Sequence, residues 1–308
     1  MRIVSLLPSA TEIVCALGLV DDLVGITHEC DWPPSIAGKP PMTRSVHDLA
    51  GARSREIHDV VGAAVHGGSS LYALDEAALA EAAPDLILTQ ELCRVCAVSY
   101  HEVNEVAREI DAAIRVVSLE PTSLEGIFNT ITTVGALTES EDAAVDLVET
   151  LRTRLGAVEA TVQDRRRGGF PAPRVVALEW LEPPFAVGHW VPEQIRRAGG
   201  WDLLGAPGER SAKTTWRSVT DVDPEMVVLM PCGFHLDETL KEWARTPRPP
   251  GWAEVEAVRR GQVFAVDGSA YFSRPGPRVI DGIEMLAEIF DPNTFVEVAP
   301  PGSWTPVN

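Results

Sequence analysis

The sequence lacks long apolar runs and a basic excess. It has no stretch of the roughly 18 apolar residues that a membrane-spanning helix needs, so membrane insertion is not expected. Its 26 Lys and Arg residues stand against 45 Asp and Glu residues, a formal net charge of −19. Nucleic-acid binding depends on Lys and Arg contacts with phosphates, so this balance argues against a nucleic-acid partner. The negative charge itself favours solubility.

Cysteine is also sparse, with five residues in 308: Cys15, Cys30, Cys93, Cys96 and Cys232. An odd, scattered set does not indicate a disulfide framework, and reduced thiols are expected. The first apolar strand begins at residue 2, which leaves no room for a secretory leader. We therefore expect a cytoplasmic protein, or a periplasmic or extracytoplasmic one if a leader has been removed.

Common catalytic signatures are missing. The chain contains no G-x-G-x-x-G, no G-x-x-x-x-G-K-[ST], no H-E-x-x-H and no G-x-S-x-G motif. No paired carboxylates occur at a defined catalytic spacing. The sequence thus favours a binding protein over an enzyme.

Short apolar runs alternate with helical patterns in an N-terminal lobe spanning residues 1–118. The predicted strands are Ile3–Leu7, Leu23–Ile26, Leu86–Thr89 and Ile114–Ser118, and the predicted helices are Ala10–Leu17, Asp75–Ala82 and His101–Glu109. This alternation is typical of βαβ units with a mostly parallel sheet. Such sheets bind ligands at the carboxyl ends of their strands.

Residues 119–170 are predicted to be linking helices. One helix is expected over Ser123–Leu137, and a longer one runs from Ser140 to Asp164, about 25 residues or 37 Å. The alternation resumes in a C-terminal lobe, residues 171–308, with strands at Arg174–Leu178, Met226–Met230 and Gln262–Val266, a last helix at Val279–Phe290 and an irregular tail from Asp291. The predicted fold class is α/β, with two Rossmann-like lobes joined by a long rigid helix.

Several motifs together carry a family resemblance. They are SLLPSATEIVCALGL (5–19), VGITHECDWPP (24–34), APDLIL (83–88), PPFAVG (183–188), RAGG (197–200), DPEMVVL (223–229) and FSRPGPR (272–278). In this order the chain resembles the cobalamin-binding branch of the ABC-transporter substrate-binding proteins, the cobalamin and iron-siderophore family. It departs from the pattern by an extra segment around Gly51 to Gly68 and by a Cys pair at Cys93 and Cys96.

The resemblance implies a substrate-binding protein of the helical-backbone class. Its ligand would be cobalamin, or another corrinoid or tetrapyrrole, bound in the cleft between the lobes, and its partner would be an ABC permease. Two alternatives stay open. One is a cytoplasmic metal or metal-chelate binder that uses Cys and His residues, and the other is an enzyme or chaperone acting on the corrinoid.

A flat corrin needs apolar faces for stacking and a few polar partners at its edge. The candidate ligand-binding residues are Ser9, His28, Glu29, Cys30, Trp32, Tyr72, Gln90, Glu91, Phe185, His189, Trp190, Trp216, Phe234, Tyr271 and Arg274. By the resemblance, Trp216 and Tyr271 are the strongest aromatic candidates. Arg274 is expected to donate to a carbonyl or phosphate edge.

Thiol and imidazole groups suggest a second chemistry. Cys93 and Cys96 form a C-x-x-C unit at a predicted strand end, and His235 follows another strand. These groups are good ligands for zinc, iron or cobalt, so the three residues are candidate metal ligands. Contact of Cys93 and Cys96 with the organic ligand, and a purely structural thiol pair, are the alternatives.

Overall fold

The protein is described by a computed structural model in which residues 1–49, 51–67, 71–90 and 100–307 are placed. The chain divides into two compact units. The N-terminal lobe comprises Met1–Ala52, Ile57–Pro121 and Gly126–Glu149, and the C-terminal lobe comprises Arg53–Glu56, Thr122–Glu125 and Thr150–Asn308. Each lobe is an α/β unit with its own sheet. The predicted two-lobed α/β fold with a long linking helix is confirmed.

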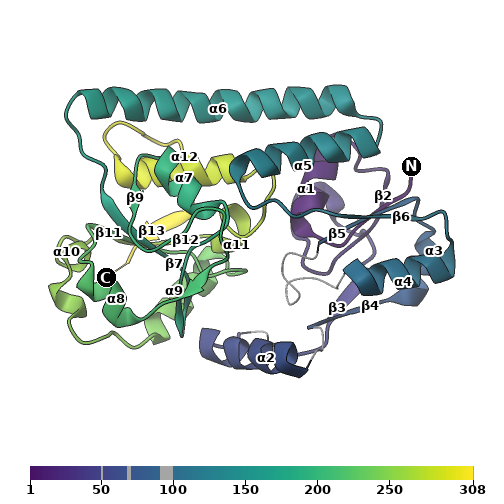
Figure 1. Ribbon diagram of the computed structural model, residues 1–308, viewed down its shortest axis with the longest axis horizontal. Helices are drawn as coiled ribbons and strands as arrows, with labels where there is room; N and C mark the ends of the chain where they lie inside the picture. Colours follow the sequence, from purple (N-terminus) through teal and green to yellow (C-terminus); the bar gives the residue numbers. More distant parts are fainter. Residues whose placement is uncertain (50, 68–70, 91–99, 308) are drawn as a thin grey trace. The chain divides into compact units, whose positions relative to one another are not determined.

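The N-terminal lobe contains a four-stranded parallel sheet in the order β2-β1-β5-β6. Its strands are β1 (Ile3–Ser5), β2 (Leu23–Ile26), β5 (Leu86–Thr89) and β6 (Arg115–Ser118), and its helices are α1 (Pro8–Ala16), α3 (Glu76–Ala82), α4 (Tyr100–Ile110) and α5 (Leu124–Leu137). Figure 1 shows α1 and α5 on one side of the sheet and α3 and α4 on the other. Both faces are covered, which explains why every residue of β1 and β5 is buried and why all but Ser5 and Thr89 are apolar.

Local chemistry explains how α1 starts and ends. Pro8 occupies the first helical turn, where its missing N–H leaves no hydrogen bond unmade. Gly18 follows the helix with φ of +81°, a left-handed conformation that glycine adopts without steric cost. Only Leu6 and Leu7 separate β1 from α1, so Ser9 lies in the first turn of the helix and close in sequence to the end of the strand.

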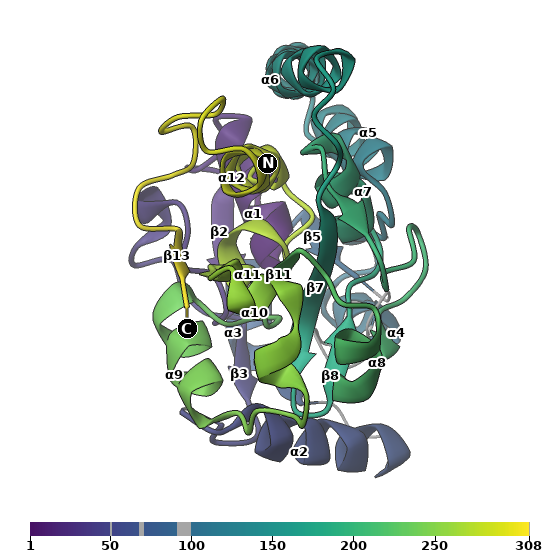
Figure 2. The same cartoon turned by 90° about the vertical axis from the view of Figure 1, so that its left-hand side faces the viewer.

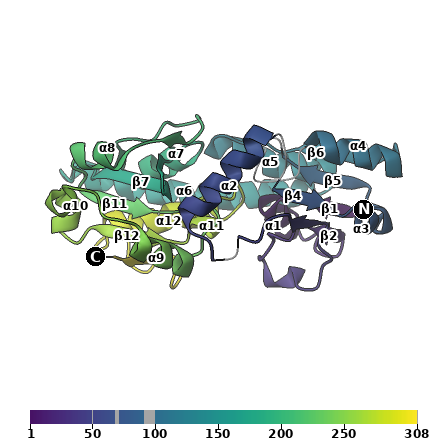
Figure 3. The same ribbon diagram turned by 90° about the horizontal axis from the view of Figure 1, so that it is seen from below.

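Four elements of this region were not predicted. A separate antiparallel pair is formed by β3 (Thr43–Ser45) and β4 (Tyr72–Leu74), and the extra segment folds into α2 (Ser54–Gly67). A 3-10 helix, η1 (Pro34–Ile36), lies in the loop between β2 and β3, and Figure 3 shows this loop beside β2. The sequence analysis assigned no structure to this extra segment, although its apolar residues repeat at helical spacing.

The long helix is α6 (Glu141–Arg167), continuous over 27 residues. It extends past the predicted end at Asp164, so the three arginines 165–167 belong to the helix and not to the loop after it. Arg165 Nε donates to Asp291 Oδ2 at 2.7 Å, and Arg154 pairs with Asp281 and Glu284 of the last helix. These ion pairs fix the second half of α6 to the C-terminal lobe.

The C-terminal lobe contains a mixed sheet in the order β10-β8-β7-β11-β12-β13, with β9 also paired to β7. Its strands are β7 (Arg174–Leu181), β8 (Pro184–Ala186), β9 (Trp201–Asp202), β10 (Ala212–Lys213), β11 (Met226–Leu229), β12 (Val263–Val266) and β13 (Trp304–Pro306). The central strands β7, β11 and β12 are parallel, whereas β8, β10 and β13 run antiparallel to their neighbours. The tail is therefore not wholly irregular: β13 pairs with β12 as an edge strand, where proline is tolerated.

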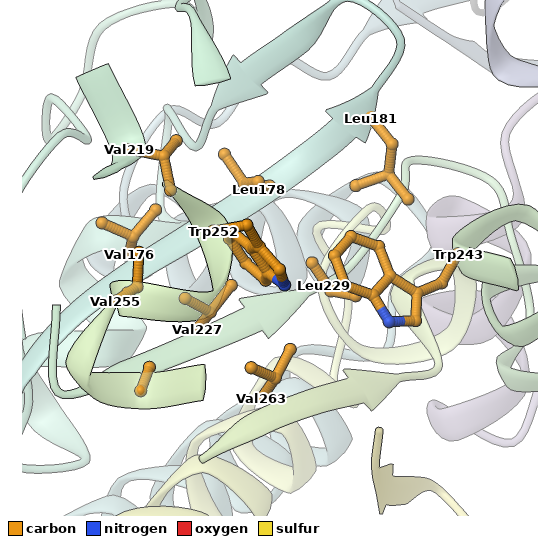
Figure 4. Packing of buried hydrophobic residues seen from close by; sticks show 11 residues of the cluster. Val176, Leu178, Leu181, Val219, Val227, Leu229, Trp243, Trp252, Val255 and Val263 are labelled. Carbon is orange, nitrogen blue, oxygen red and sulfur yellow. The ribbon is translucent and has the colours of Figure 1, made fainter. Parts of the chain in front are cut away.

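Helices cover both faces of this sheet. They are α7 (Val191–Arg197), α8 (Trp216–Asp221), α9 (Leu236–Arg245), α10 (Glu256–Arg259), α11 (Gly268–Tyr271) and α12 (Val279–Phe290), with a 3-10 helix η2 (Trp252–Glu254). Figure 2 shows α7 and α12 on the α6 side, and α8, α9 and α10 lie on the opposite side (Figures 1 and 3). The face beneath α8 and α9 packs Val176, Leu178, Val227 and Leu229 against Trp243 and Trp252 (Figure 4).

Within the part of the chain that the structure describes, no helix is both long enough and apolar enough to cross a membrane.

Candidate functional site

The first group of candidate residues follows β1 and β2 of the N-terminal lobe. Thr11 Oγ1 donates to Ser5 Oγ at 2.8 Å and lies 3.1 Å from Cys30 Sγ. Ser9 is buried in the first turn of α1. A hydroxyl and thiol chain thus connects the ends of two neighbouring parallel strands, the edge where doubly wound sheets bind ligands.

His28 is held by the β3–β4 pair. Its Nδ1 lies 2.7 Å from Thr43 Oγ1, and its ring packs edge-on against Tyr72 with centroids 5.0 Å apart. The other ring nitrogen, Nε2, is 3.1 Å from Glu29 Oε1. The structure therefore brings three candidate residues of this lobe, His28, Glu29 and Tyr72, into contact.

The loop after β2 encloses an open hollow of about 400 Å³ in the N-terminal lobe. It is lined by Thr27, His28, Cys30, Asp31 and Lys39 together with several prolines. Trp32 leads into a cis peptide bond with Pro33, and 45% of its surface is exposed. This hollow combines apolar walls with a thiol, an imidazole and both charge signs.

The predicted metal site is not supported. Gln90 follows β5 and is half-buried, but Glu91, Cys93 and Cys96 lie outside the described residues. Among the residues that are described, no group of three or more His, Cys, Asp or Glu side chains could hold a metal ion. His235 Nδ1 lies 2.9 Å from Asp267 Oδ2, and the backbone N–H of His235 donates to Glu238 Oε2 at 2.9 Å.

Two polar side chains of the C-terminal lobe, His235 and Asp267, lie in the loops that follow β11 and β12. His235 precedes α9, and its Nδ1 lies 2.9 Å from Oδ2 of Asp267, which follows β12. Asp267 Oδ1 accepts from Ala270 N at 2.8 Å and so caps α11. Gly268 allows the start of α11 to pack closely against the backbone that follows β11, because a Cβ at this position would overlap the carbonyl oxygen of Pro231.

Aromatic side chains gather beside this pair. Phe234 packs edge-on against Trp180, near the end of β7, with ring centroids 5.5 Å apart. Phe185 of β8 pairs with Trp180 across the antiparallel ladder. Trp180 and Phe185 lie on adjacent strands and Phe234 lies in the loop after β11, so the three rings form one aromatic group.

The loop between α11 and α12 is fixed from beneath by α7. Gln194 Nε2 donates to the carbonyls of Tyr271 and Val279, at 3.2 and 2.8 Å, and Trp190 Nε1 donates to the carbonyl of Phe272 at 3.1 Å. Trp190 is itself buried and packs within the lobe. These bonds hold Tyr271 on the surface of the lobe at an ordered position.

Arg274 is buried, and its guanidinium donates to Ser269 Oγ at 3.2 Å. Its neighbour in the same loop, Ser273, accepts from Gly233 N at 3.3 Å and donates to the carbonyl of Gly268 at 2.9 Å. The loop is thereby joined to the end of β11, the strand that leads to Phe234 and His235.

His189 has an unusual environment. Its backbone is left-handed with φ of 52°, and its N–H donates to the carbonyl of Glu209 at 2.6 Å. Burial, aided by the nearby positive charge of Arg210, lowers the pKa of the imidazole. Its Nδ1 is buried and has no hydrogen-bond partner among the described residues. The surroundings therefore favour the neutral imidazole, and the Trp190 ring stacks on it.

Trp216 lies apart from these groups, at the start of α8. Its ring contacts Trp252 and Trp243, with centroid distances of 5.7 and 6.2 Å. It is half-buried and packs against the apolar cluster of Figure 4.

Sequence reasoning passed over two partners of the candidate residues, namely Thr43 and Asp267. Asp267 carried a recoverable signal, because an aspartate directly after a predicted strand and before glycine is a typical helix cap. Thr43 carried none. Its role depends on a hairpin formed by strands 27 residues apart in sequence.

Two α/β lobes with a long linking helix, and polar and aromatic strand-end loops in each lobe, define a solute-binding protein. The family model described as "Periplasmic binding protein" matches residues 3–270, and the chain belongs to this family. The resemblance seen in the sequence motifs is confirmed.

Curated relatives span almost the whole chain. An uncharacterised ABC transporter substrate-binding lipoprotein of Bacillus subtilis is 25% identical over 301 residues, covering 96% of this chain and 82% of the relative. A vitamin B12-binding protein of Vibrio cholerae is 20% identical and covers 97% and 90%. A cobalamin-binding protein of Halobacterium salinarum is 24% identical and covers 96% and 70%.

Solved structures share the fold at low identity. A periplasmic heme-binding protein of Pseudomonas aeruginosa has a TM-score of 0.71 at 19% identity, covering 100% of this chain and 95% of that one. The periplasmic vitamin B12-binding protein of Vibrio cholerae has a TM-score of 0.66 at 19% identity, covering 94% and 96%.

These findings correct one expectation and confirm another. The prediction of a cytoplasmic location is wrong, because the family is that of periplasmic binding proteins and its relatives include a lipoprotein and a periplasmic protein. The prediction that the chain is not an enzyme is confirmed, because the family and its structural neighbours are solute-binding proteins.

Proposed function

We propose that this protein binds a corrinoid, with cobalamin as the first candidate, and serves as the substrate-binding component of an ABC uptake system. The observation that carries the proposal is the aromatic strand-end group of the C-terminal lobe, Trp180, Phe185 and Phe234, beside the polar pair His235 and Asp267. Stacking faces with a few polar groups at their edge suit a corrin ring and its amide side chains.

The N-terminal lobe adds compatible chemistry at its own strand ends. Ser9 lies in the first turn of α1, and His28 and Cys30 follow β2 and line the hollow of about 400 Å³, which has apolar and polar walls. Two curated relatives bear the names vitamin B12-binding protein and cobalamin-binding protein, which supports the same ligand class. An ABC permease is the expected partner, because a curated relative is described as an ABC transporter substrate-binding lipoprotein.

Haem, or another metal chelate, is the second candidate ligand. It is favoured by the fold neighbours described as heme-binding proteins and by a ferric hydroxamate transport protein of Saccharomonospora viridis. Haem is as flat and apolar as a corrin, so the same aromatic rings could stack on it. The imidazole of His235, next to Phe234, would then suit its iron.

A parallel titration tests the proposal. The purified protein is titrated with cyanocobalamin, hemin and a ferric hydroxamate, with tryptophan quenching and visible absorption followed together. Corrinoid binding should quench tryptophan emission with 1:1 stoichiometry, while hemin and the hydroxamate bind more weakly. Tighter binding of hemin with a shifted Soret band would favour the second candidate. Failure of all three to bind would refute both.

A further inference from the structure

The short segment Arg53–Glu56 packs as part of the C-terminal lobe, although most of that lobe is formed by Thr150–Asn308. Ser54, at the start of α2, has no exposed surface. Its N–H and Oγ both donate to Oε1 of Glu242 in α9, at 3.1 and 2.5 Å. Glu242 is 1% exposed, and its other oxygen, Oε2, has no hydrogen-bond partner among the described residues. The two donors of Ser54 are thus the recorded partners of a buried carboxylate.

Arg53 adds charged contacts to the same segment. Its Nη2 lies 2.7 Å from Glu182 Oε2 and 3.2 Å from the carbonyl oxygen of Arg245, at the end of α9. The side chain of Glu182 is 11% exposed and that of Arg53 is 38% exposed, so the carboxylate is shielded from solvent while the guanidinium stays partly hydrated. We call the contacts of Arg53 and Ser54 with Glu182 and Glu242 the Ser54 anchor.

The anchor ends on an aromatic ring of the candidate site. Trp180 Nε1 donates to the carbonyl oxygen of Ser54 at 3.1 Å. The Trp180 ring also packs edge-on against Phe234. An indole N–H can only donate, so the position of its acceptor selects the orientation of the ring.

From this geometry we propose that Ser54 is a positioning residue, which fixes the Trp180 indole as a stacking face for a flat tetrapyrrole ligand. The inference rests on the proposed function and deepens it. A ring that is already oriented loses less conformational freedom when the ligand binds, and affinity rises accordingly. Ser54 acts only through Trp180 and needs no contact with the ligand.

Four variants test the inference. Ser54→Ala removes the hydroxyl donor to Glu242, Ser54→Thr retains it, and Trp180→Phe keeps an aromatic ring but removes the indole N–H. Thr161→Ala is the matched control, because its exposed hydroxyl donates only to the carbonyl of Ala157 within α6. Affinities for cyanocobalamin and hemin are measured by tryptophan quenching, and the exchange rate of the Trp180 indole proton is followed by NMR.

Ser54→Ala is expected to weaken binding about three- to tenfold and to speed exchange of the indole proton, since a hydrogen bond to a charged buried group is lost. Ser54→Thr should recover affinity and slow exchange, and Thr161→Ala should change neither. Trp180→Phe should weaken binding similarly, and adding Ser54→Ala to it should cost little more, because both act through one ring.

The outcomes separate the two proposals. Lack of binding by the unaltered protein would overturn the proposed function. Binding by the unaltered protein with unchanged affinity and indole exchange in Ser54→Ala would overturn this inference alone. If Ser54→Ala does not fold, Trp180→Phe decides. Unchanged affinity in that variant overturns the inference, and weakened affinity with the circular dichroism of the unaltered protein supports it.

Discussion

His235 and Asp267 face each other across the ends of two adjacent parallel strands, with 2.9 Å between Nδ1 and Oδ2. Asp267 uses its other oxygen to cap α11, so one carboxylate orients an imidazole and starts a helix. The side chain of Asp267 is 18% exposed and that of His235 is 44% exposed. The more buried Asp267 therefore helps to fix the position of the more exposed His235.

Asp267→Ala should lower the free energy of unfolding by about 1–2 kcal/mol, the usual cost of losing a helix cap. Urea denaturation followed by far-ultraviolet circular dichroism measures it. Asp267→Asn is the control, because an asparagine oxygen can still accept from Ala270 N, and it should recover part of the loss. Equal stability of all three proteins would contradict the capping role.

His189 predicts a pH dependence of stability. Burial lowers the pKa of its imidazole in the folded protein, so the unfolded chain binds a proton at a higher pH than the folded one. Stability from this group is complete above the ordinary histidine pKa, about 6.5, and is lost as the pH falls through the lowered folded value. Denaturation midpoints of the unaltered protein should therefore decrease more between pH 8 and pH 5 than those of His189→Gln. His47→Gln, at an exposed position, should follow the unaltered protein, and identical profiles for all three would rule the effect out.

Gly268→Ala should destabilise the C-terminal lobe by about 2 kcal/mol, because the added Cβ overlaps the backbone of Pro231 and Met230. Gly156→Ala is the matched control: it lies in α6 with no atom within 4 Å of the added carbon, and should stabilise by about 1 kcal/mol. Thermal unfolding of both variants checks the signs. A neutral Gly268→Ala would mean that α11 can move away from β11 at little cost.

Trp216→Ala should lower the free energy of unfolding by about 2–4 kcal/mol, since the ring packs against Trp243 and Trp252. Trp201→Ala, at a 61% exposed position, should change it by no more than about 0.5 kcal/mol. Urea denaturation gives both values. Trp216 stays a predicted ligand contact, and corrinoid affinity of the folded variant tests that separately. A loss of affinity without a loss of stability would place the ring in the site and not in the core.

Local patterns in the sequence were sufficient to predict the four strands of the N-terminal sheet and the three central parallel strands of the C-terminal sheet, but not β8, β9, β10 or β13. Leu23–Ile26, Leu86–Thr89 and Val279–Phe290 have the predicted bounds, because apolar spacing and flanking breakers act over a few residues. The motif order also identified the family. These features depend on residues that are close together in the chain, so they can be recognised from the sequence without knowing the tertiary structure.

The tertiary structure decided the rest. The antiparallel pairing of β13, the docking of Ser54 onto Glu242 188 residues away, and the contact of His28 with Thr43 all need groups from distant segments placed within about 3 Å. A serine, a glutamate and a three-residue strand look ordinary in the sequence, since any hydroxyl or carboxylate can find a partner. Which partner it finds depends on how the lobe packs, and burial then makes that pairing costly to break.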